Sequence, residues 1–181
     1  MQITPTQLPG VLIIEPKVFS DGRGFFYESF NAKNFNELTA LNVQFVQDNH
    51  SLSVKNVLRG LHYQIHNTQG KLVRVTHGEV FDVVVDLRKH SPYFGNWIGT
   101  TLSAKNHRQL WIPQGFAHGF LVTSDQAEFL YKTTDYWAPE HERCLRWDDP
   151  SIGIIWPLSG DPIVSAKDQQ GKLLADTEIF K

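Results

Sequence analysis

A series of short apolar segments, separated by turn residues at fairly regular intervals, most constrains the fold of this chain. Many short strands at such spacing are typical of an all-β sandwich or barrel, because alternating α/β units need helical stretches between their strands. Gly78–Leu87 is almost continuously apolar, which is typical of a strand covered on both faces. We therefore predict strands over Val11–Glu15, Phe25–Phe30, Gln44–Ser51, Val57–Gln64, Lys71–Thr76, Gly78–Leu87, Trp97–Leu102, Gln109–Ile112, Ala117–Val122 and Ala127–Thr133.

One short helix is expected among these strands. Apolar residues recur at three-residue spacing from Phe35 to Leu41, and Asn31 is a suitable N-cap, so we predict a helix over Ala32–Leu41. Beyond Tyr136 the sequence turns irregular and rich in Pro and Asp. We expect this C-terminal part to wrap the barrel and to form little more than short helical pieces.

Composition limits the classes of function. The chain has 181 residues, enough for one domain with a substantial core, and its formal net charge of −2 excludes a strongly basic nucleic-acid footprint. A single cysteine, Cys144, allows no internal disulfide and fits a reducing cytoplasm. The N-terminus lacks the basic and apolar regions of a signal peptide, and no apolar run is long enough to span a membrane. We expect a soluble, cytoplasmic, globular protein with one domain over residues 1–181.

Polar side chains occur where burial is expected, in the stretch Val57–Val75. His62 and the cations Arg59 and Lys71 lie within two short apolar runs joined by a polar turn. A buried polar group is costly unless it has a partner, so this stretch indicates a bound ligand or a second set of polar residues. Strict alternation would place Arg59 and His62 on opposite faces of one strand. We therefore predict a bulge at Gly60 that re-aims one of them.

Two motifs carry a resemblance to a known family. Residues 58–64 read LRGLHYQ and are followed by GKLVR at 70–74, and residues 113–120 read PQGFAHGF. These motifs resemble those of the dTDP-4-dehydrorhamnose 3,5-epimerase family. The agreement extends in order over essentially the whole chain, with DGRGFF at 21–26, QDNHS at 47–51, RWDDP at 146–150 and SAKD at 165–168.

The resemblance implies a cupin-type jelly roll, a homodimer, and a nucleotide-sugar substrate in place of a metal, with no cofactor. We expect the dimer to form by sheet extension through the N-terminal strand, and we expect neither nucleic acid nor membrane as a partner. The implied reaction converts dTDP-4-dehydro-6-deoxy-D-glucose to dTDP-4-dehydro-L-rhamnose. That product leads to dTDP-L-rhamnose and to glycans such as the lipopolysaccharide O-antigen.

Inversion of a carbon next to a ketone requires a base, an acid facing it and a group that stabilises the enolate between the two steps. Histidine has an unperturbed pKa of about 6.5, near working pH, and His62 is the base that we expect. A carboxylate behind the base fixes its tautomer. By the family pattern Asp168 is that carboxylate, Tyr131 is the acid, and Lys71 holds the C4 oxygen.

The remaining substrate contacts also follow from the resemblance. A diphosphate suits arginine, whose guanidinium fork pairs with phosphate oxygens, and Arg23 and Arg59 are the candidates. Phe26 is expected to flank the nucleotide, and Asp48 to supply local backbone. The other expected pocket residues are Glu28, Gln47, Asn49, His118, Glu142 and Lys167.

Trp137 is a departure from the family pattern. The family usually has a tyrosine at this position that stacks on the thymine, and tryptophan stacks at least as well but lacks the phenol hydroxyl. We expect Trp137 to contact the nucleobase, with the neighbouring Tyr136 as a substitute.

Three alternatives stay open. A metal-dependent cupin typically has two histidines one residue apart, but His62 is followed at that spacing by Gln64, and only His118 fits the later position. A non-catalytic sugar-binding module is a second alternative, because fold does not fix function, but such a module needs no acid and base. A relative that epimerises only C3 or only C5 would share nearly every motif. The presence of Tyr131 favours double epimerisation, because the second proton must arrive from the opposite face.

Overall fold

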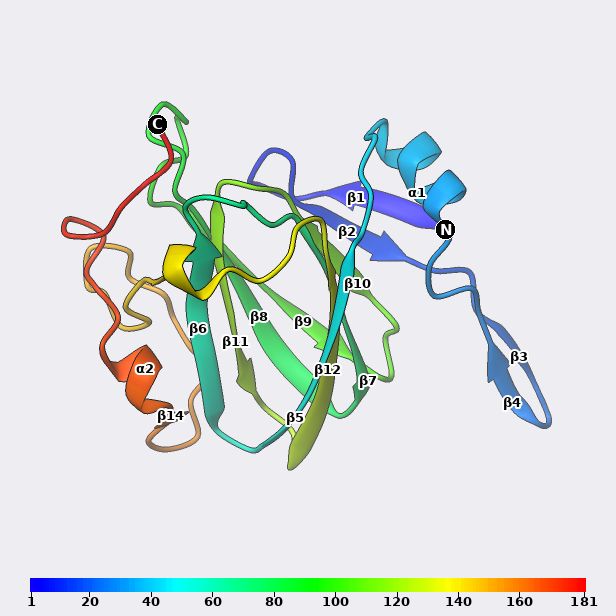
Figure 1. The fold of residues 1–181 in the computed structure, drawn as a ribbon. Helices are drawn as coiled ribbons and strands as arrows, with labels where there is room; N and C mark the ends of the chain where they lie inside the picture. The colour runs from blue at the N-terminus through cyan, green and yellow to red at the C-terminus, as the bar shows by residue number, and fades with distance from the viewer.

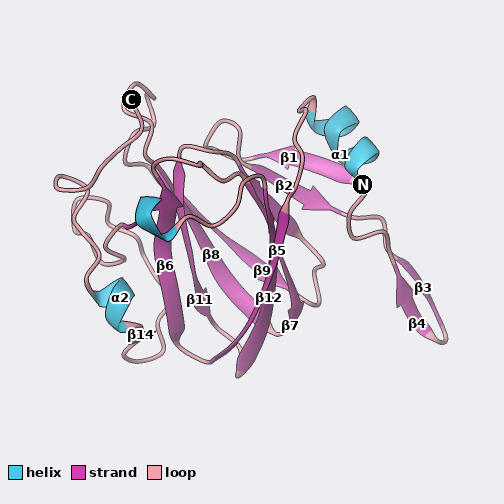
Figure 2. Cartoon of the chain, viewed as in Figure 1, coloured by secondary structure: helices cyan, strands magenta, loops and turns pink.

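Two sheets that face each other form the body of the protein, as a computed structural model of residues 1–181 shows (Figures 1 and 2). The first sheet has the strand order β1-β2-β10-β7-β12-β5. Its strands are β1 (Gln2–Pro5), β2 (Leu12–Glu15), β10 (Gln109–Ile112), β7 (Lys71–His77), β12 (Gln126–Thr133) and β5 (Gln47–Val54).

The second sheet has the order β13-β6-β11-β8-β9, with β14 paired in parallel to β6. Its strands are β13 (Glu142–Cys144), β6 (Val57–Gln64), β11 (Phe116–Val122), β8 (Glu79–Asp86), β9 (Trp97–Ser103) and β14 (Ile163–Val164). Every other pairing in the two sheets is antiparallel. The predicted all-β jelly roll is therefore confirmed.

The remaining elements lie outside the sandwich. A small hairpin of β3 (Phe19–Asp21) and β4 (Gly24–Phe26) projects away from the body (Figure 1). Helix α1 (Ala32–Thr39) lies near β1 and β2, and the 3₁₀ turn η1 (Pro139–His141) and helix α2 (Ala166–Gln169) belong to the C-terminal part. No helix in the structure is long and apolar enough to cross a membrane.

The main core lies between the sheets. Val73, Val75 and Phe129 of the first sheet pack in one buried cluster with residues of the second sheet, among them Val80 and Phe120. The rings of Phe120 and Phe129 stack at a centroid distance of 4.2 Å. This contact joins the two sheets and helps to set the distance between them. Burial of such apolar side chains is the main favourable contribution to folding.

A second cluster covers the outer face of the second sheet. Val83 and Val85 of β8 pack there with Leu145, Ile152 and Trp156 from the C-terminal part. The other face of β8 belongs to the main core, so the prediction of a strand covered on both faces is confirmed. The expected C-terminal wrap is confirmed as well, but it also contributes strands β13 and β14, which the irregular sequence did not predict.

A third cluster holds α1 on the outer face of the first sheet. Asn31 caps the helix, accepting a hydrogen bond from the backbone N–H of Asn34, as predicted. Phe35 is almost fully buried, and its ring makes T-shaped contacts with the rings of Phe45 and Trp111. The helix ends at Thr39, two residues before the predicted end, because Ala40 adopts a left-handed backbone conformation.

Some predicted strand boundaries were wrong. The strand predicted over Phe25–Phe30 ends at Phe26, because the following Tyr27 packs on His107 and Phe30 turns toward the α1 cluster. The strand predicted over Gln44–Ser51 begins at Gln47 instead. Alternating apolar side chains are typical of a strand, but here Phe30, Val43 and Phe45 anchor a segment outside the sheets to the third cluster.

The two halves of the polar stretch Val57–Val75 belong to different sheets. β6 pairs with β11, β13 and β14, whereas β7 pairs with β10 and β12. The polar turn between them therefore crosses from one sheet to the other and does not close a hairpin. His62 and Lys71, nine residues apart, approach each other from facing sheets.

The α1 cluster yields a stability prediction. We expect Phe35→Ala to lower the free energy of unfolding by about 3–5 kcal/mol, because a buried aromatic side chain is replaced by a cavity. Leu38→Ala in the same helix is the control, since Leu38 is 54% exposed and its loss is expected to cost about 0.5 kcal/mol or less. Urea unfolding followed by circular dichroism measures both, and equal effects of the two substitutions would contradict the proposed anchoring of α1.

Candidate functional site

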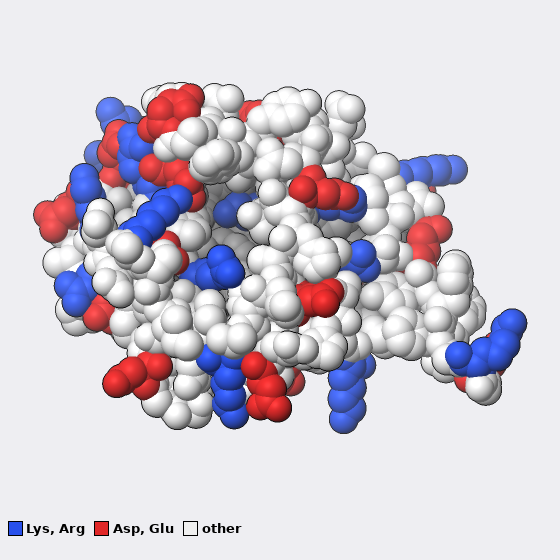
Figure 3. All heavy atoms as spheres, turned by 60° about the horizontal axis from the view of Figure 1, so that its bottom comes forward, with Lys and Arg blue, Asp and Glu red and all other residues white.

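A cavity of about 420 Å³ opens between the two sheets. Strands β5, β7 and β12 line it from the first sheet, and β6, β11 and β13 line it from the second, with the segment 165–168 at its side. Figure 3 shows a hollow in the surface with cationic side chains in and around it. The cavity residues are Asn49, His50, Ser51, Arg59, His62, Lys71, His118, Gly119, Phe120, Phe129, Tyr131, Glu142, Ser165, Lys167 and Asp168.

A histidine–carboxylate pair lies at this cavity. The Nε2 atom of His62 is 2.5 Å from Oδ1 of Asp168, and the Asp168 side chain is almost fully buried. Burial alone would raise the pKa of Asp168, but the hydrogen bond and charge of His62, with hydrogen bonds from the backbone N–H of Gly60 and the side chain of Ser165, outweigh burial and lower it. Asp168 is therefore an ionised carboxylate that fixes the ring of His62.

A bulge in β6 makes this pair accessible. His62 lies opposite His118 and Arg59 lies opposite Phe120, so that two residues of β6 face the single Gly119 of β11. The bulge predicted at Gly60 is therefore confirmed, and both Arg59 and His62 line the cavity. The backbone N–H of Gly60 donates to Oδ2 of Asp168 at 3.3 Å.

Glycine is required at this close approach of the strands. Gly60 has a φ of +109°, a backbone conformation that L side chains rarely adopt. A Cβ atom on Gly60 would lie 2.7 Å from the carbonyl oxygen of His118, and one on Gly119 would lie 2.4 Å from that of Arg59. No side chain fits between β6 and β11 at this point.

Lys71 is a buried cation in the same cavity. Its Nζ donates to the carbonyl oxygen of His62 at 3.4 Å, and its residue is 9% exposed. Burial lowers the pKa of Lys71 to about 8, although the negative charges of Glu142 and Asp82 act in the opposite direction. The ammonium group is therefore desolvated and directed at the cavity, where a developing negative charge would interact with it strongly.

Tyr131 lies on the sheet that faces His62. It belongs to β12, and its hydroxyl has no hydrogen-bond partner within the protein. Burial raises the pKa of Tyr131, and the charge of Glu142 raises it further against the opposing effect of Arg59. The phenol is therefore protonated at neutral pH, with a proton that it can donate.

An ion pair and a tryptophan form the rim. Nζ of Lys167 is 2.6 Å from Oε2 of Glu142, and the indole N–H of Trp137 donates to the same oxygen at 3.0 Å. The backbone N–H of Trp137 also donates to Oε1 of Gln47, whose amide nitrogen donates to Asn49. Trp137 thereby links β5 and β13, which are edge strands of the two sheets. It remains 57% exposed.

Gln64 holds the loop that carries this tryptophan. Its buried amide donates to the carbonyl oxygens of Asn67 and Tyr136 and accepts from the backbone N–H of Ala138. The position where a metal-dependent cupin has its second histidine is thus occupied by a side chain whose polar atoms bond the Tyr136–Ala138 loop.

Sequence reasoning missed a second histidine–carboxylate pair. Nε2 of His118 lies 2.9 and 3.1 Å from the two carboxylate oxygens of Asp82, which is fully buried. Burial raises the pKa of Asp82, with the charge and hydrogen bond of His118 opposing it. The sequence does indicate this pair, because Asp82 interrupts the apolar run of β8 on the face that points into the core.

Cys144 was likewise not assigned to the site. It lies opposite His62 in the β13–β6 pair, with Sγ 3.9 Å from Oδ1 of Asp168. Burial, followed by the charge of Asp168, raises the pKa of its thiol to about 12. The group is a protonated thiol next to the dyad.

Six of the expected substrate-binding residues do not line the cavity of this chain: Gln47 and Trp137, which lie at its rim, and Arg23, Phe26, Glu28 and Asp48. Arg23 and Phe26 are exposed on the β3–β4 hairpin, which projects away from the sandwich (Figure 1). Glu28 follows that hairpin and accepts a hydrogen bond from Asn34. Asp48 lies on the outer face of β5, because side chains alternate, and pairs with Lys132.

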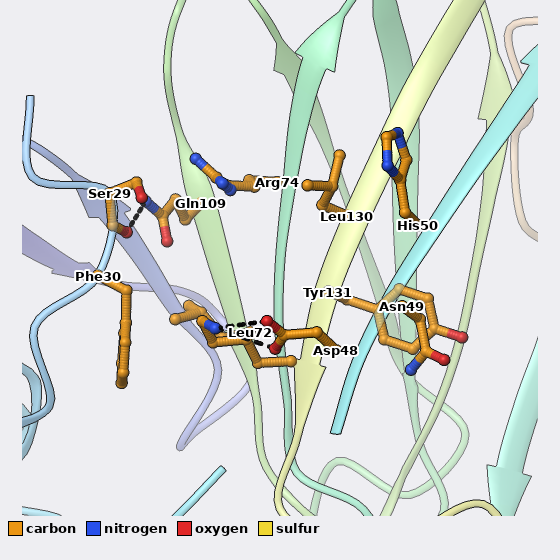
Figure 4. Close-up of a pocket in the computed structure, with 11 residues that line it drawn as sticks. Ser29, Phe30, Asp48, Asn49, His50, Leu72, Arg74, Gln109, Leu130 and Tyr131 are labelled. Carbon is orange, nitrogen blue, oxygen red and sulfur yellow. Dashed lines mark hydrogen bonds and ion pairs between the residues drawn. The ribbon is translucent and has the colours of Figure 1, made fainter. Parts of the chain in front are cut away.

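A separate pocket of about 400 Å³ lies on that outer side (Figure 4). It contains the Asp48–Lys132 ion pair and a hydrogen bond from the Gln109 side chain to the carbonyl oxygen of Ser29. Asp48 and Lys132 are paired with each other, and neither His62 nor Asp168 lines this pocket. The acid–base groups converge on the cavity between the sheets.

Comparison with known proteins agrees with this arrangement. The sequence profile of the dTDP-4-dehydrorhamnose 3,5-epimerase family matches residues 5–176. The chain is 61% identical to the dTDP-4-dehydrorhamnose 3,5-epimerase of Pseudomonas aeruginosa, over 99% of both chains. It is 60% identical to the enzyme of the same name from Salmonella typhimurium, over 96% of both chains.

A solved structure agrees equally well. The dTDP-6-deoxy-D-glucose-3,5-epimerase of Legionella pneumophila, in complex with dTDP-4-keto-L-rhamnose, superposes with a TM-score of 0.96 at 55% identity, covering 98% of this chain and 94% of that one. Sequence, fold and the converging acid–base groups lead to one assignment: the chain belongs to the dTDP-4-dehydrorhamnose 3,5-epimerases, a family of isomerases.

Proposed function

We propose that this chain inverts C3 and C5 of dTDP-4-dehydro-6-deoxy-D-glucose to form dTDP-4-dehydro-L-rhamnose by proton transfer alone. One observation carries the proposal. His62 on β6 and Tyr131 on β12 face one cavity from opposite sheets, so a sugar bound there has a base on one side and an acid on the other. Such an arrangement lets one proton leave from one face of the carbon and a different proton arrive at the opposite face.

The proposed roles follow the state of each group. His62, oriented by the ionised Asp168, removes the proton next to the C4 ketone. The ammonium group of Lys71 stabilises the enolate oxygen, and the protonated phenol of Tyr131 then donates to the other face. Water restores both groups before the second carbon is inverted.

The rim supplies binding. Arg59 and Lys167 are exposed cations at the cavity and suit a diphosphate. The exposed ring of Trp137 is already held in place by hydrogen bonds from its backbone and indole N–H groups. Stacking on a nucleobase would therefore cost little further conformational entropy. Asn49, His118 and Glu142 would complete the sugar-binding surface, with Gln47 fixing Trp137 and Asn49.

A homodimer is part of the proposal. Phe19, Phe25 and Phe26 are between 54 and 72% exposed on the projecting hairpin, which is a large apolar surface for an element of two short strands. A second copy that covers this hairpin would bring Arg23 and Phe26 to the cavity of its neighbour. The strand β1 lies at a sheet edge, where extension by another chain is sterically open.

The remaining parts of the proposal are coarser. We take residues 1–181 to act as one jelly-roll epimerase domain. A cytoplasmic location fits the single cysteine, which has no partner for a disulfide within the chain.

Proton exchange tests the reaction. We expect chelator-treated protein in D2O to introduce deuterium at both C3 and C5 of dTDP-4-dehydro-6-deoxy-D-glucose, because each inversion passes through an enolate; proton NMR of the sugar measures this. Exchange at one carbon would identify a single-site epimerase. Exchange that needs added metal would overturn the proton-transfer mechanism.

Tyr131→Phe is the decisive variant in that assay. Net inversion is expected to fall by about 10²–10⁴-fold, whereas deuterium exchange should persist, since the base is intact. Tyr63→Phe is the matched control, because Tyr63 bonds Thr177 and the carbonyl of Glu178 outside the cavity. Unchanged inversion by Tyr131→Phe would remove Tyr131 from its proposed role.

Substitution of Lys71 yields a further prediction, in which stability increases while turnover decreases. The pKa of Lys71 is about 8 in the fold against a usual 10.5, so the unfolded chain binds more protons between these values and wild-type stability rises with pH there. We expect Lys71→Met to raise the free energy of unfolding at pH 7 by about 1–3 kcal/mol, and this gain to shrink toward pH 10.

The same substitution should reduce turnover by about 10²–10³-fold, because the enolate loses its cation. Denaturant unfolding at several pH values and the NMR assay measure the two effects. Lys132→Met, at a lysine paired with Asp48 on the outer face, is the control and should change neither greatly. A Lys71→Met protein that retains turnover would show that Lys71 serves binding or structure instead.

Sedimentation equilibrium tests the dimer. We expect the wild-type chain to be dimeric and Phe25→Asp to be monomeric yet folded, because a charge on the hairpin opposes its burial. Ile155→Asp is the control, since Ile155 is 78% exposed on the C-terminal part. A monomeric wild-type chain, or a Phe25→Asp chain that remains dimeric, would contradict the proposed interface.

A further inference from the structure

The thiol of Cys144 completes a set of three different donor groups. Register places Cys144 directly opposite His62, and α2 brings Asp168 to both. Nε2 of His62, Sγ of Cys144 and a carboxylate oxygen of Asp168 all lie within 4.8 Å of one another. Nothing in the proposed epimerisation uses the thiol.

The types of donor indicate which cation would suit them. Imidazole nitrogen, thiolate sulfur and carboxylate oxygen are the three ligands that zinc takes in proteins, whereas magnesium and calcium prefer oxygen alone. Zinc bonds of roughly 2.0–2.3 Å set tetrahedral ligands about 3.3–3.8 Å apart. The Sγ–Oδ1 distance of 3.9 Å is close to this range, and the His62–Asp168 contact of 2.5 Å would open by less than an ångström or so.

We propose that His62, Cys144 and Asp168 form an inhibitory site for zinc, which binds in place of the protons of the dyad and blocks the base. The cavity leaves the fourth coordination position open to water, because the side chain of His62 is 28% exposed. The thiol proton and the proton between His62 and Asp168 both pass to water as the zinc bonds form.

Local charge favours a cation at this place. The carboxyl group of Asp168 lies beside the thiol, with its Oδ1 atom 3.9 Å from Sγ of Cys144. The nearest opposing cation, Lys167, is neutralised by Glu142 at 2.6 Å. The buried Lys71 lies on the facing sheet. It donates to the backbone carbonyl oxygen of His62 and not to the imidazole ring.

The proposed site differs from that of a metal-dependent cupin. His118, the second histidine of the cavity, is held by both carboxylate oxygens of Asp82, and Gln64 is directed at the Tyr136–Ala138 loop. Neither is free to join His62. The third ligand comes from β13, on the side of β6 away from β11.

Cobalt is the spectroscopic probe for this site. We expect Co²⁺ added to chelator-treated protein to bind with a stoichiometry of one and to show a thiolate-to-cobalt charge-transfer band in the near ultraviolet. This band should be absent in Cys144→Ser. His66→Asn, which removes one ring of the exposed His66–His141 pair, should leave it unchanged. Absence of the band in the wild-type protein would overturn the proposal.

Zinc titration of the epimerase assay tests inhibition, and this part depends on the proposed function. The metal-free turnover of Cys144→Ser should stay within about twofold of the wild-type value. Half-inhibition should need at least about tenfold more zinc, because loss of a group that only supports a ligand already lowers metal affinity about 10–100-fold. Equal zinc sensitivity of the two proteins would contradict the site. A charge-transfer band in a protein without epimerase activity would instead refute the proposed function and support the metal site.

Discussion

The close approach of β6 and β11 at Gly60 and Gly119 is the contact on which the site depends. Because neither glycine has a side chain, the two backbones meet at a distance that no other residue allows. The bulge that results turns His62 and Arg59 toward one cavity and frees the N–H of Gly60 for Asp168. One local irregularity of the ladder thus aims the base, orients its carboxylate and places a cation beside them.

The interior of this sandwich contains several ionisable side chains, and most of them are paired with a partner. Asp168 is balanced by His62 and the backbone N–H of Gly60, and Asp82 is balanced by His118. Lys71 is the least balanced of these groups, with one long hydrogen bond to a carbonyl oxygen. Active sites commonly retain such poorly solvated charges because they interact strongly with charge that develops in the substrate, at a cost in stability.

Much of the fold was predictable because the strands are short and clearly bounded. β6 and β10 have the predicted bounds, and the predicted bulge and helix cap are present. Periodicity could not distinguish a strand from a crossing segment anchored by aromatic rings, which is why the region from Tyr27 to Val46 was assigned wrongly in part. It also gave no indication that β6 and β7 separate into different sheets.

The sequence indicated which types of side chain form the site better than it indicated which distant segments bring them together. His62 was indicated by its apolar surroundings, but Asp168, 106 residues away, followed only from the family resemblance. The positions of Arg23 and Phe26 depend on where the β3–β4 hairpin projects, which no local pattern encodes. Asp82 could have been found from its place in an apolar strand, whereas the contact of Cys144 depends on the pairing of β13 with β6.

The C-terminal wrap has a consequence for the order in which the protein matures. Asp168 and Lys167 are the last of the cavity residues to be synthesised, and they belong to the C-terminal part that packs on the outer face of the second sheet through Leu145, Ile152 and Trp156. A chain that has folded its sandwich but not this segment has an unoriented base. The dyad therefore requires the C-terminal part to be in place, and chains in which this part has not folded are expected to be inactive rather than weakly active.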